Sequence, residues 1–191
     1  MMLSSRLHRI LLVCLASVVL FAAGGHKAHA QQVGLKMNAL MYALGTPNLG
    51  CELMVKEHSS VDITLMGHYK PYTIDSKFIA IQPEYRFWFN GRPMVREFVG
   101  VSAMFASYDM NIRNYIYDGL AASLGIVGGY AFMLNRDWRL ELCGGLSLLY
   151  FHQKQYYETD EFFVDPAARA NSWGYKLFPA KLGVTFTYII K

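Results

Sequence analysis

Apolar side chains alternate with small or polar ones through most of this chain, and this period of two limits what the chain can fold into. In residues 99–105 (VGVSAMF), for example, the alternation continues over several steps. Successive side chains of a β-strand point to opposite faces, so the pattern predicts strands with one apolar face. Eight such segments can be identified: residues 33–42, 48–55, 61–66, 79–89, 95–108, 121–134, 138–151 and 175–190.

The first thirty residues are expected to be an export signal rather than part of the fold. Three basic residues precede an apolar run (10–21), and residues 28–30 (AHA) supply a site for cleavage after a small residue. The apolar run is short for a membrane-spanning helix. We therefore predict a cleaved signal peptide over residues 1–30 and one β-barrel domain over residues 31–191.

The links between the predicted strands alternate between short and long. An antiparallel up-and-down sheet places alternate links at opposite ends, so one end is trimmed and the other carries long loops, as in outer-membrane barrels. Short links with turn-forming residues are expected at residues 57–60, 90–93 and 134–137, and the first link, 44–47, is also short. Longer links are expected at residues 71–77, 109–118 and 152–173.

The side chains on the less apolar face of the strands indicate that the apolar face meets lipid. This face is mostly Gly, Ala, Ser, Thr and Asn, which suits the interior of a narrow barrel, whereas a soluble barrel would carry many charges there. Four aromatic residues near strand ends are candidates for membrane-interface girdles: Tyr85, Trp138, Tyr150 and Tyr188. The prediction is an all-β fold, an eight-stranded antiparallel up-and-down transmembrane β-barrel with a cleaved N-terminal signal helix. A soluble lipocalin-like barrel is the alternative.

Charged side chains also fall on the inward face. Unpaired charges inside a narrow barrel would be costly, so we expect an interior polar network of ion pairs that fills the lumen. Glu84 and Arg86, two residues apart on one face, are expected at its centre. The alternative is a gated path for small solutes or protons. The members of the network are Lys36, Glu52, Glu84, Arg86, Glu141 and Lys181.

The two cysteines of the predicted domain are expected to be free thiols. Cys51 is predicted on the outward face and Cys143 on the inward face of a strand that is not adjacent. Disulfide geometry requires the two β-carbons to face each other at short range, which this arrangement does not allow.

The predicted link at residues 152–173 is the most function-like surface. Long loops with aromatic residues often bind partners, and the candidate surface-binding residues here are Tyr156, Tyr157, Phe162 and Phe163. The alternative is that the two flanking strands extend past the membrane as a hairpin.

No catalytic residues are assigned, and no metal or other cofactor is expected. Polar residues near the loop-rich end could belong to a lipid-modifying enzyme, but no spacing among them specifies a nucleophile, a base and an orienting group. No basic stripe stands out either, so nucleic acid is not expected as a partner. The polar residues at that end are His68, Asp75, Asp109, Asp118, His152 and Ser172.

The last predicted strand ends in a motif that resembles the signal by which the barrel assembly machinery recognises an outer-membrane protein. Residues 181–188 (KLGVTFTY) fit its pattern of a polar residue, a glycine and two apolar residues, at Lys181, Gly183, Phe186 and Tyr188. The chain departs from the common form because it continues for three residues to Lys191.

Several segments of the chain resemble the family numbered 3575 among the domains of unknown function: residues 48–52, 81–88, 128–130, 138–141 and 181–184. The resemblance implies a small outer-membrane β-barrel of Gram-negative bacteria, encoded in some members beside fimbrial or adhesin genes. The resemblance also implies that Glu52, Glu84, Arg86 and Glu141 are motif residues of the family, which has no role assigned to them. The implied function is a non-enzymatic surface scaffold or an accessory to fimbria or envelope assembly. The implied partners are outer-membrane lipid, the barrel assembly machinery, and a surface or fimbrial protein.

Overall fold

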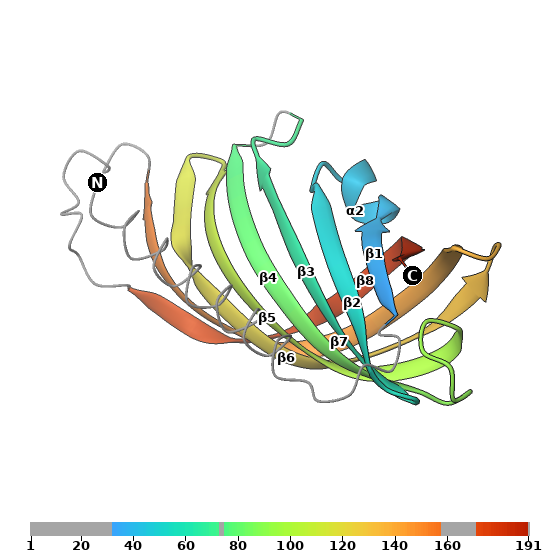
Figure 1. Cartoon of the computed structure of the whole chain (residues 1–191). Helices are drawn as coiled ribbons and strands as arrows, with labels where there is room; N and C mark the ends of the chain where they lie inside the picture. The colour runs from blue at the N-terminus through green and yellow to red at the C-terminus, as the bar shows by residue number, and fades with distance from the viewer. Residues whose placement is uncertain (1–31, 73–74, 158–170, 191) are drawn as a thin grey trace. The chain divides into compact units, whose positions relative to one another are not determined.

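The computed structural model describes residues 32–72, 75–157 and 171–190, which form a closed β-barrel (Figure 1). Each strand is antiparallel to its neighbours in chain order, and the last strand also pairs with the first. The prediction of eight antiparallel strands in one up-and-down sheet is therefore confirmed. The elements are β1 (Val33–Asn38), α2 (Ala39–Ala43), β2 (Asn48–Lys56), β3 (Ser59–Tyr69), β4 (Ser76–Trp88), β5 (Arg96–Ile112), β6 (Tyr115–Met133), β7 (Trp138–Tyr157) and β8 (Ser172–Ile190).

The two ends of the barrel can be named by their links. At the trimmed end, β1 begins, β8 ends, and the links are residues 57–58, 89–95 and 134–137. At the opposite end, here called the hairpin end, α2 and its turn join β1 to β2, and residues 113–114 join β5 to β6. The predicted signal peptide, and Phe162 and Phe163, lie outside the described residues.

The first strand is shorter than predicted. Residues 33–42 were expected to form one strand, but β1 ends at Asn38 and α2 follows. The Asn38 side-chain oxygen accepts hydrogen bonds from the backbone N–H groups of Leu40 and Met41, which caps the helix. The side chain of Asn48 bonds to the backbone N–H and carbonyl of Asn38, so it takes the place of a strand partner there.

The predicted long link at residues 109–118 is wrong, because β5 and β6 continue to a two-residue turn at Arg113 and Asn114. Both residues have positive φ, 54° and 64°, as a type I′ hairpin turn requires. The described part of residues 152–173 is likewise strand rather than loop, because β7 runs to Tyr157 and β8 begins at Ser172. The hairpin alternative is correct for that part.

A β-bulge in β8 changes which face some side chains occupy. The pairing of β7 with β8 shifts between Gly145 and Leu146, which face Lys181 and Pro179 respectively. Phe178, predicted on the outward apolar face, therefore pairs with the buried Ser147 and lies on the lumen face. Strand periodicity alone could not place Phe178, because one inserted residue inverts every assignment beyond it.

The lumen contains three layers, which can be followed along the inward face of β4. Phe78 and Ala80 lie toward the hairpin end and belong to an apolar cluster with Met104. Glu84 and Arg86 follow in a charged layer, and Trp88 closes the series at the trimmed end. Trp88 packs there in a second apolar cluster, whose large members are Trp88, Met94, Phe98, Val127 and Ile189.

Candidate functional site: the barrel interior

Seven charged side chains meet in the lumen and form one connected network, here called the charge network. Arg86 is fully buried at its centre. Its Nε lies 2.6 Å from Glu84 Oε1, its Nη1 2.8 Å from Glu141 Oε2 and 3.1 Å from Glu52 Oε2, and its Nη2 2.9 Å from Asp62 Oδ2. The structure thus brings together all six predicted residues and one more: Lys36, Glu52, Asp62, Glu84, Arg86, Glu141 and Lys181.

The two lysines approach the carboxylates from β1 and β8, and they share one carboxylate, Asp62. Lys36 Nζ lies 2.7 Å from Glu141 Oε2, 2.8 Å from Glu52 Oε2 and 3.1 Å from Asp62 Oδ2. Lys181 Nζ lies 3.0 Å from Glu84 Oε2 and 3.5 Å from Asp62 Oδ2. β1 and β8 pair with each other where the sheet closes. Inside the lumen they are also linked to β3, through the ion pairs of Lys36 and Lys181 with Asp62.

Asp62 is the member that the sequence analysis missed. It occupies the polar position of an alternating segment, between Val61 and Ile63, which is the same signal that identified the other six. With Asp62 included, the charge network has four carboxylates and three cations. Thr64 Oγ1 donates a hydrogen bond to Asp62 Oδ1 at 3.0 Å, so this carboxylate is held from its own strand.

Neutral groups orient the charge network from the trimmed end. Trp88 Nε1 donates to Ser60 Oγ at 2.8 Å, and Ser60 Oγ donates to Glu52 Oε1 at 2.5 Å. The Arg86 guanidinium lies 4.4 Å from the centre of the Phe98 ring, an arrangement in which an aromatic face stabilises a cation. A β-carbon at Gly100 would come within 2.9 Å of the Tyr85 carbonyl oxygen, so glycine is needed for this close packing.

Among the buried polar atoms without a hydrogen bond to the described residues, two at the charge network also take part in none of its ion pairs: Glu141 Oε1 and Thr185 Oγ1. Glu141 and Thr185 are directly opposite each other in the pairing of β7 with β8. Thr185 is 3% exposed and lines the cavity described next. Buried polar groups are normally satisfied, so this pair marks a place that a polar group or a water molecule can occupy.

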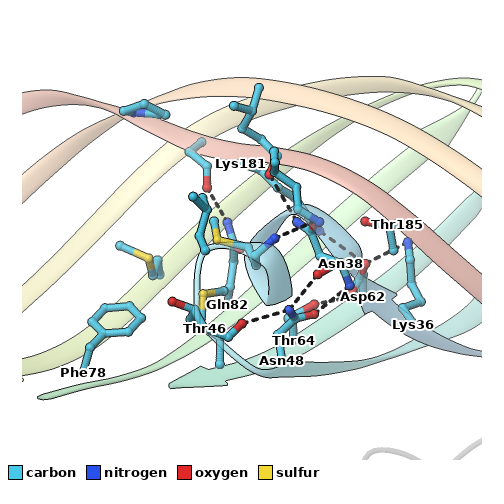
Figure 2. A pocket seen from close by; sticks show the side chains of 18 of the residues that line it. Lys36, Asn38, Thr46, Asn48, Asp62, Thr64, Phe78, Gln82, Lys181 and Thr185 are labelled. Atoms are coloured by element: carbon cyan, nitrogen blue, oxygen red, sulfur yellow. Dashed lines mark hydrogen bonds and ion pairs between the residues drawn. The ribbon is translucent and has the colours of Figure 1, made fainter. Parts of the chain in front are cut away.

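A cavity of about 320 Å³ lies in the hairpin-end part of the lumen (Figure 2). Polar and charged residues form one side of it, including Lys36, Asp62, Lys181 and Thr185, while Phe78 lies on the other side. Apolar side chains form most of the remaining wall: Leu40, Met41, Leu44, Met66, Met104, Phe178 and Leu182. The sequence analysis did not predict this cavity.

The polar residues considered for catalysis do not gather at one place. Asp75 pairs with Lys70 at 3.1 Å and Asp109 with Lys77 at 3.4 Å, and all four side chains are about half exposed. The hydrogen bond with Asp75 raises the pKa of Lys70. Asp118 on β6 lies opposite Asp109 on β5, whereas His152 on β7 lies opposite Trp173, and Ser172 on β8 lies opposite Gln153.

His68 does form a hydrogen-bonded chain that the sequence analysis missed. Its Nε2 lies 2.8 Å from Ser76 Oγ, and its Nδ1 lies 3.0 Å from Thr46 Oγ1. A serine–histidine pair can act in acyl transfer, but an orienting carboxylate usually holds the imidazole, and a hydroxyl takes that position here. Ser76 is also buried. The geometry favours a structural role, in which the two hydrogen bonds of His68 hold the α2–β2 link and β4 to β3.

Aromatic residues do gather where β6 and the described part of β7 reach the hairpin end. The ring of Tyr115 lies 4.8 Å from that of Tyr157 and 5.2 Å from that of Tyr117, measured between ring centres. Tyr157, a predicted binding residue, is exposed and Tyr156 adjoins it on β7. We call Tyr115, Tyr117 and Tyr157 the tyrosine cluster.

The residues of the proposed assembly motif divide between the two faces of β8. Lys181 belongs to the charge network, and Gly183 faces Asn38, whose side chain a β-carbon would meet. Phe186 and Tyr188 lie on the opposite face, where Tyr188 packs against Trp138.

The two cysteines are free, as predicted, with Cys143 buried and Cys51 partly exposed. No helix among the described residues is both long enough and apolar enough to cross a membrane.

Comparison with known proteins gives one result. No curated protein and no solved structure matches the chain. A family model described as a protein of unknown function, DUF3575, matches residues 13–190, which is nearly the whole chain. The chain therefore belongs to the DUF3575 family, as its sequence motifs predicted.

Proposed function

We propose that this protein is a non-enzymatic β-barrel of the Gram-negative outer membrane that serves as a surface scaffold or as an accessory to fimbria or envelope assembly. Residues 1–30 are its cleaved export signal, and Gln31 is the first residue of the mature chain. The observation that carries the proposal is an apolar outer band that surrounds a lumen crossed by a layer of paired charges.

The outer band is clearest on β7 and β8. Trp138 packs against Tyr188 near the trimmed end, and Tyr150 packs against Tyr175 further along, with ring centres 5.2 Å and 5.1 Å apart. Residues 138 and 150 are separated by about 30 Å along the barrel axis, taking roughly 3.3 Å per residue and a tilt of about 40°. That separation matches the hydrocarbon thickness of a bilayer. The outward side chains between the two pairs on β7 are apolar: Leu140, Leu142, Leu146 and Leu148.

The inverted distribution of charge supports the same location. A soluble barrel keeps its charges outside and its apolar side chains inside. Here seven charged side chains are buried in the lumen, while many large apolar side chains are exposed on the outer face. Lipid would cover that outer face and make the arrangement stable.

The filled lumen argues against the pore alternative. The charge network crosses the lumen, because Arg86 on β4 contacts Glu52 on β2 and Glu141 on β7. Beyond it, Met94 from the β4–β5 link packs with Trp88 and Phe98 toward the trimmed end, and is only 2% exposed. Ions crossing the barrel would have to displace both layers.

Membrane location can be tested by expressing the full chain in a Gram-negative host. We expect Gln31 at the N-terminus of the mature protein, recovery in the outer-membrane fraction, and a gel mobility that changes on heating. A mature chain that stays in solution without detergent would contradict the proposal.

Conductance separates the scaffold from a pore. In planar bilayers the purified barrel is expected to show no steady openings. Large steady openings of the unaltered barrel would support the pore instead.

The surface role predicts where a partner binds. A photoreactive amino acid at Tyr157, in the tyrosine cluster, is expected to cross-link a surface or fimbrial protein on intact cells. The matched control is the same amino acid at His58, an exposed residue of the trimmed-end turn. Equal products from both positions would argue against a surface partner.

A further inference from the structure

The cavity in the hairpin-end part of the lumen has the size and lining of a ligand site. Its volume of about 320 Å³ lies within the range of small-molecule pockets, roughly 300 to 1,000 Å³. Met66, Phe78, Met104 and Phe178 give it apolar walls. The charge network forms its floor, through Lys36, Asp62 and Lys181. A molecule in the cavity therefore meets apolar surface on most sides and a charged layer only toward the trimmed end.

The barrel wall beside this cavity is incomplete as a sheet. The pairing of β1 with β8 ends at Asn38 and Thr185, because the chain then turns into α2. Beyond that point β8 pairs with β7 on one side, and on the other side it contacts α2. Pro179, which has no N–H group, and the bulge beside it lie in this stretch of β8, as is common where a strand forms an edge.

At this seam between α2 and β8, Asn38 Nδ2 donates a hydrogen bond to the Leu182 carbonyl at 3.2 Å, and the Leu182 side chain belongs to both the outer face and the cavity lining. Leu182 is 58% exposed on the outer face of the barrel, and it also lines the cavity. Its partner across β7 is Gly144, where an added β-carbon would meet nothing within 4 Å. The outer surface therefore has a shallow depression on the β7 side of Leu182, in which a narrow molecule can lie next to the exposed Leu182 side chain.

The depth of the seam identifies the molecule. Gly144 lies midway between Trp138 and Tyr150, and therefore within the outer band proposed to meet hydrocarbon. At that depth the surrounding molecules present acyl chains rather than headgroups. We propose that the cavity binds one acyl chain of a lipid from the surrounding leaflet, which passes between α2 and β8; this proposal rests on the proposed membrane location.

The floor of the cavity determines how the chain lies. Charged side chains block the path toward the trimmed end, so the chain turns toward Met66, Phe78 and Met104 at the hairpin end. Thr185 is at least nine-tenths buried, lines the cavity, and has no hydrogen-bond partner among the described residues for its hydroxyl. A hydroxyl group on the bound chain would satisfy it.

Photolabelling in a bilayer tests this proposal. The purified barrel is placed in lipid nanodiscs that contain a phospholipid with a diazirine in the middle of one acyl chain. After irradiation, peptide mass spectrometry is expected to find label on the lumen-facing residues Met66, Phe78 and Met104. Label confined to outward residues such as Leu124 and Leu148 would overturn the proposal.

Three variants identify the path. Leu182→Trp narrows the seam and Met104→Trp fills the cavity, so each is expected to remove lumenal label while label on the outer band stays constant. Leu148→Trp adds the same side chain to the outer band away from the seam and is expected to change nothing. Heat-dependent gel mobility verifies that each variant is folded. Lumenal label that survives both of the first two variants would overturn the proposal.

A second probe distinguishes the source of the chain. A diazirine fatty acid is added from water to the barrel in unlabelled nanodiscs. If this probe labels Met104 rapidly in the Leu182→Trp variant, while the phospholipid probe gives no lumenal label in the unaltered barrel, the ligand arrives from the hairpin end and the proposal is wrong. A barrel that does not insert into nanodiscs contradicts both proposals, whereas insertion without lumenal label contradicts only this one.

Discussion

The two halves of the barrel interior are filled in different ways. Toward the trimmed end, Trp88, Met94 and Phe98 pack tightly against one another beneath the charge network. Toward the hairpin end, Phe78 and Met104 surround a cavity. We call these the packed half and the hollow half. The packed half suits a permanent plug, whereas the hollow half keeps apolar surface that packing does not use.

The difference follows from the links. At the trimmed end, the β4–β5 link inserts Met94 into the lumen, where it is buried. At the hairpin end, β1 stops at Asn38, and α2 lies in the place of a continued strand. A helix of five residues contributes few side chains, so the volume between β8 and β3 stays partly open.

The largest effect is expected at the boundary between the halves. Arg86→Met leaves four buried carboxylates with only Lys36 and Lys181, and removing one partner of a buried ion pair costs about 3–5 kcal/mol. We expect at least that loss in the free energy of unfolding, measured by denaturant titration of the barrel in lipid vesicles.

Lys77→Met is the matched control, because its pair with Asp109 is exposed and worth about 1 kcal/mol or less. Equal losses from the two variants would show that the charge network does not support the fold.

A phenylalanine in each half provides the next comparison. Phe98→Ala removes a ring that is 3% exposed and touches both Trp88 and Arg86, so a loss of about 3–5 kcal/mol is expected. Phe78→Ala removes a ring that already borders the cavity, so the expected loss is about 1–2 kcal/mol. The same titration measures both. Similar losses would mean that the hollow half is as well packed as the other.

The sequence predicted the strands and most of the charge network for one reason. Side chains two residues apart share a face, so Glu84 and Arg86 could be placed in the lumen without knowledge of their partners. Asp62 satisfies the same rule and could have been included. The free state of Cys51 and Cys143 followed from the same assignment of faces.

The hollow half could not be predicted, because it depends on where the pairing ends. Asn38 fits the alternation of β1, but its side chain caps α2, and that choice depends on Asn48 from another strand. The β-bulge between Pro179 and Lys181 moves Phe178 into the lumen. Each change involves a single residue and leaves the period of two intact on either side.

Larger side chains should lower the free energy of unfolding more in the packed half than in the hollow half, by a smaller difference than the phenylalanine variants. Val127 is fully buried in the packed half, and Val127→Leu inserts a methylene group where no space remains, which costs about 1–3 kcal/mol. Met104→Phe adds a ring to the wall of the cavity, so a change of about 0.5 kcal/mol or less is expected. A large loss from Met104→Phe would show that the cavity is already occupied in the folded barrel or too narrow to fill.

The smallest perturbation is chemical and leaves stability nearly unchanged. In a Cys51→Ala background, Cys143 remains as a buried thiol beside the charge network, and its Sγ lies 3.8 Å from the Gly183 carbonyl oxygen. The second variant replaces Cys143 with Ala and carries Met104→Cys, which places a thiol in the wall of the cavity. N-ethylmaleimide dissolves in lipid and reacts only with accessible thiols. With each barrel folded in vesicles, mass spectrometry is expected to show rapid modification of the introduced thiol and slow modification of Cys143. Because both thiols face the lumen, faster reaction at residue 104 is the result expected from the greater space around it. Equal rates would mean that the barrel opens as a whole, and that the two halves differ in composition but not in accessibility.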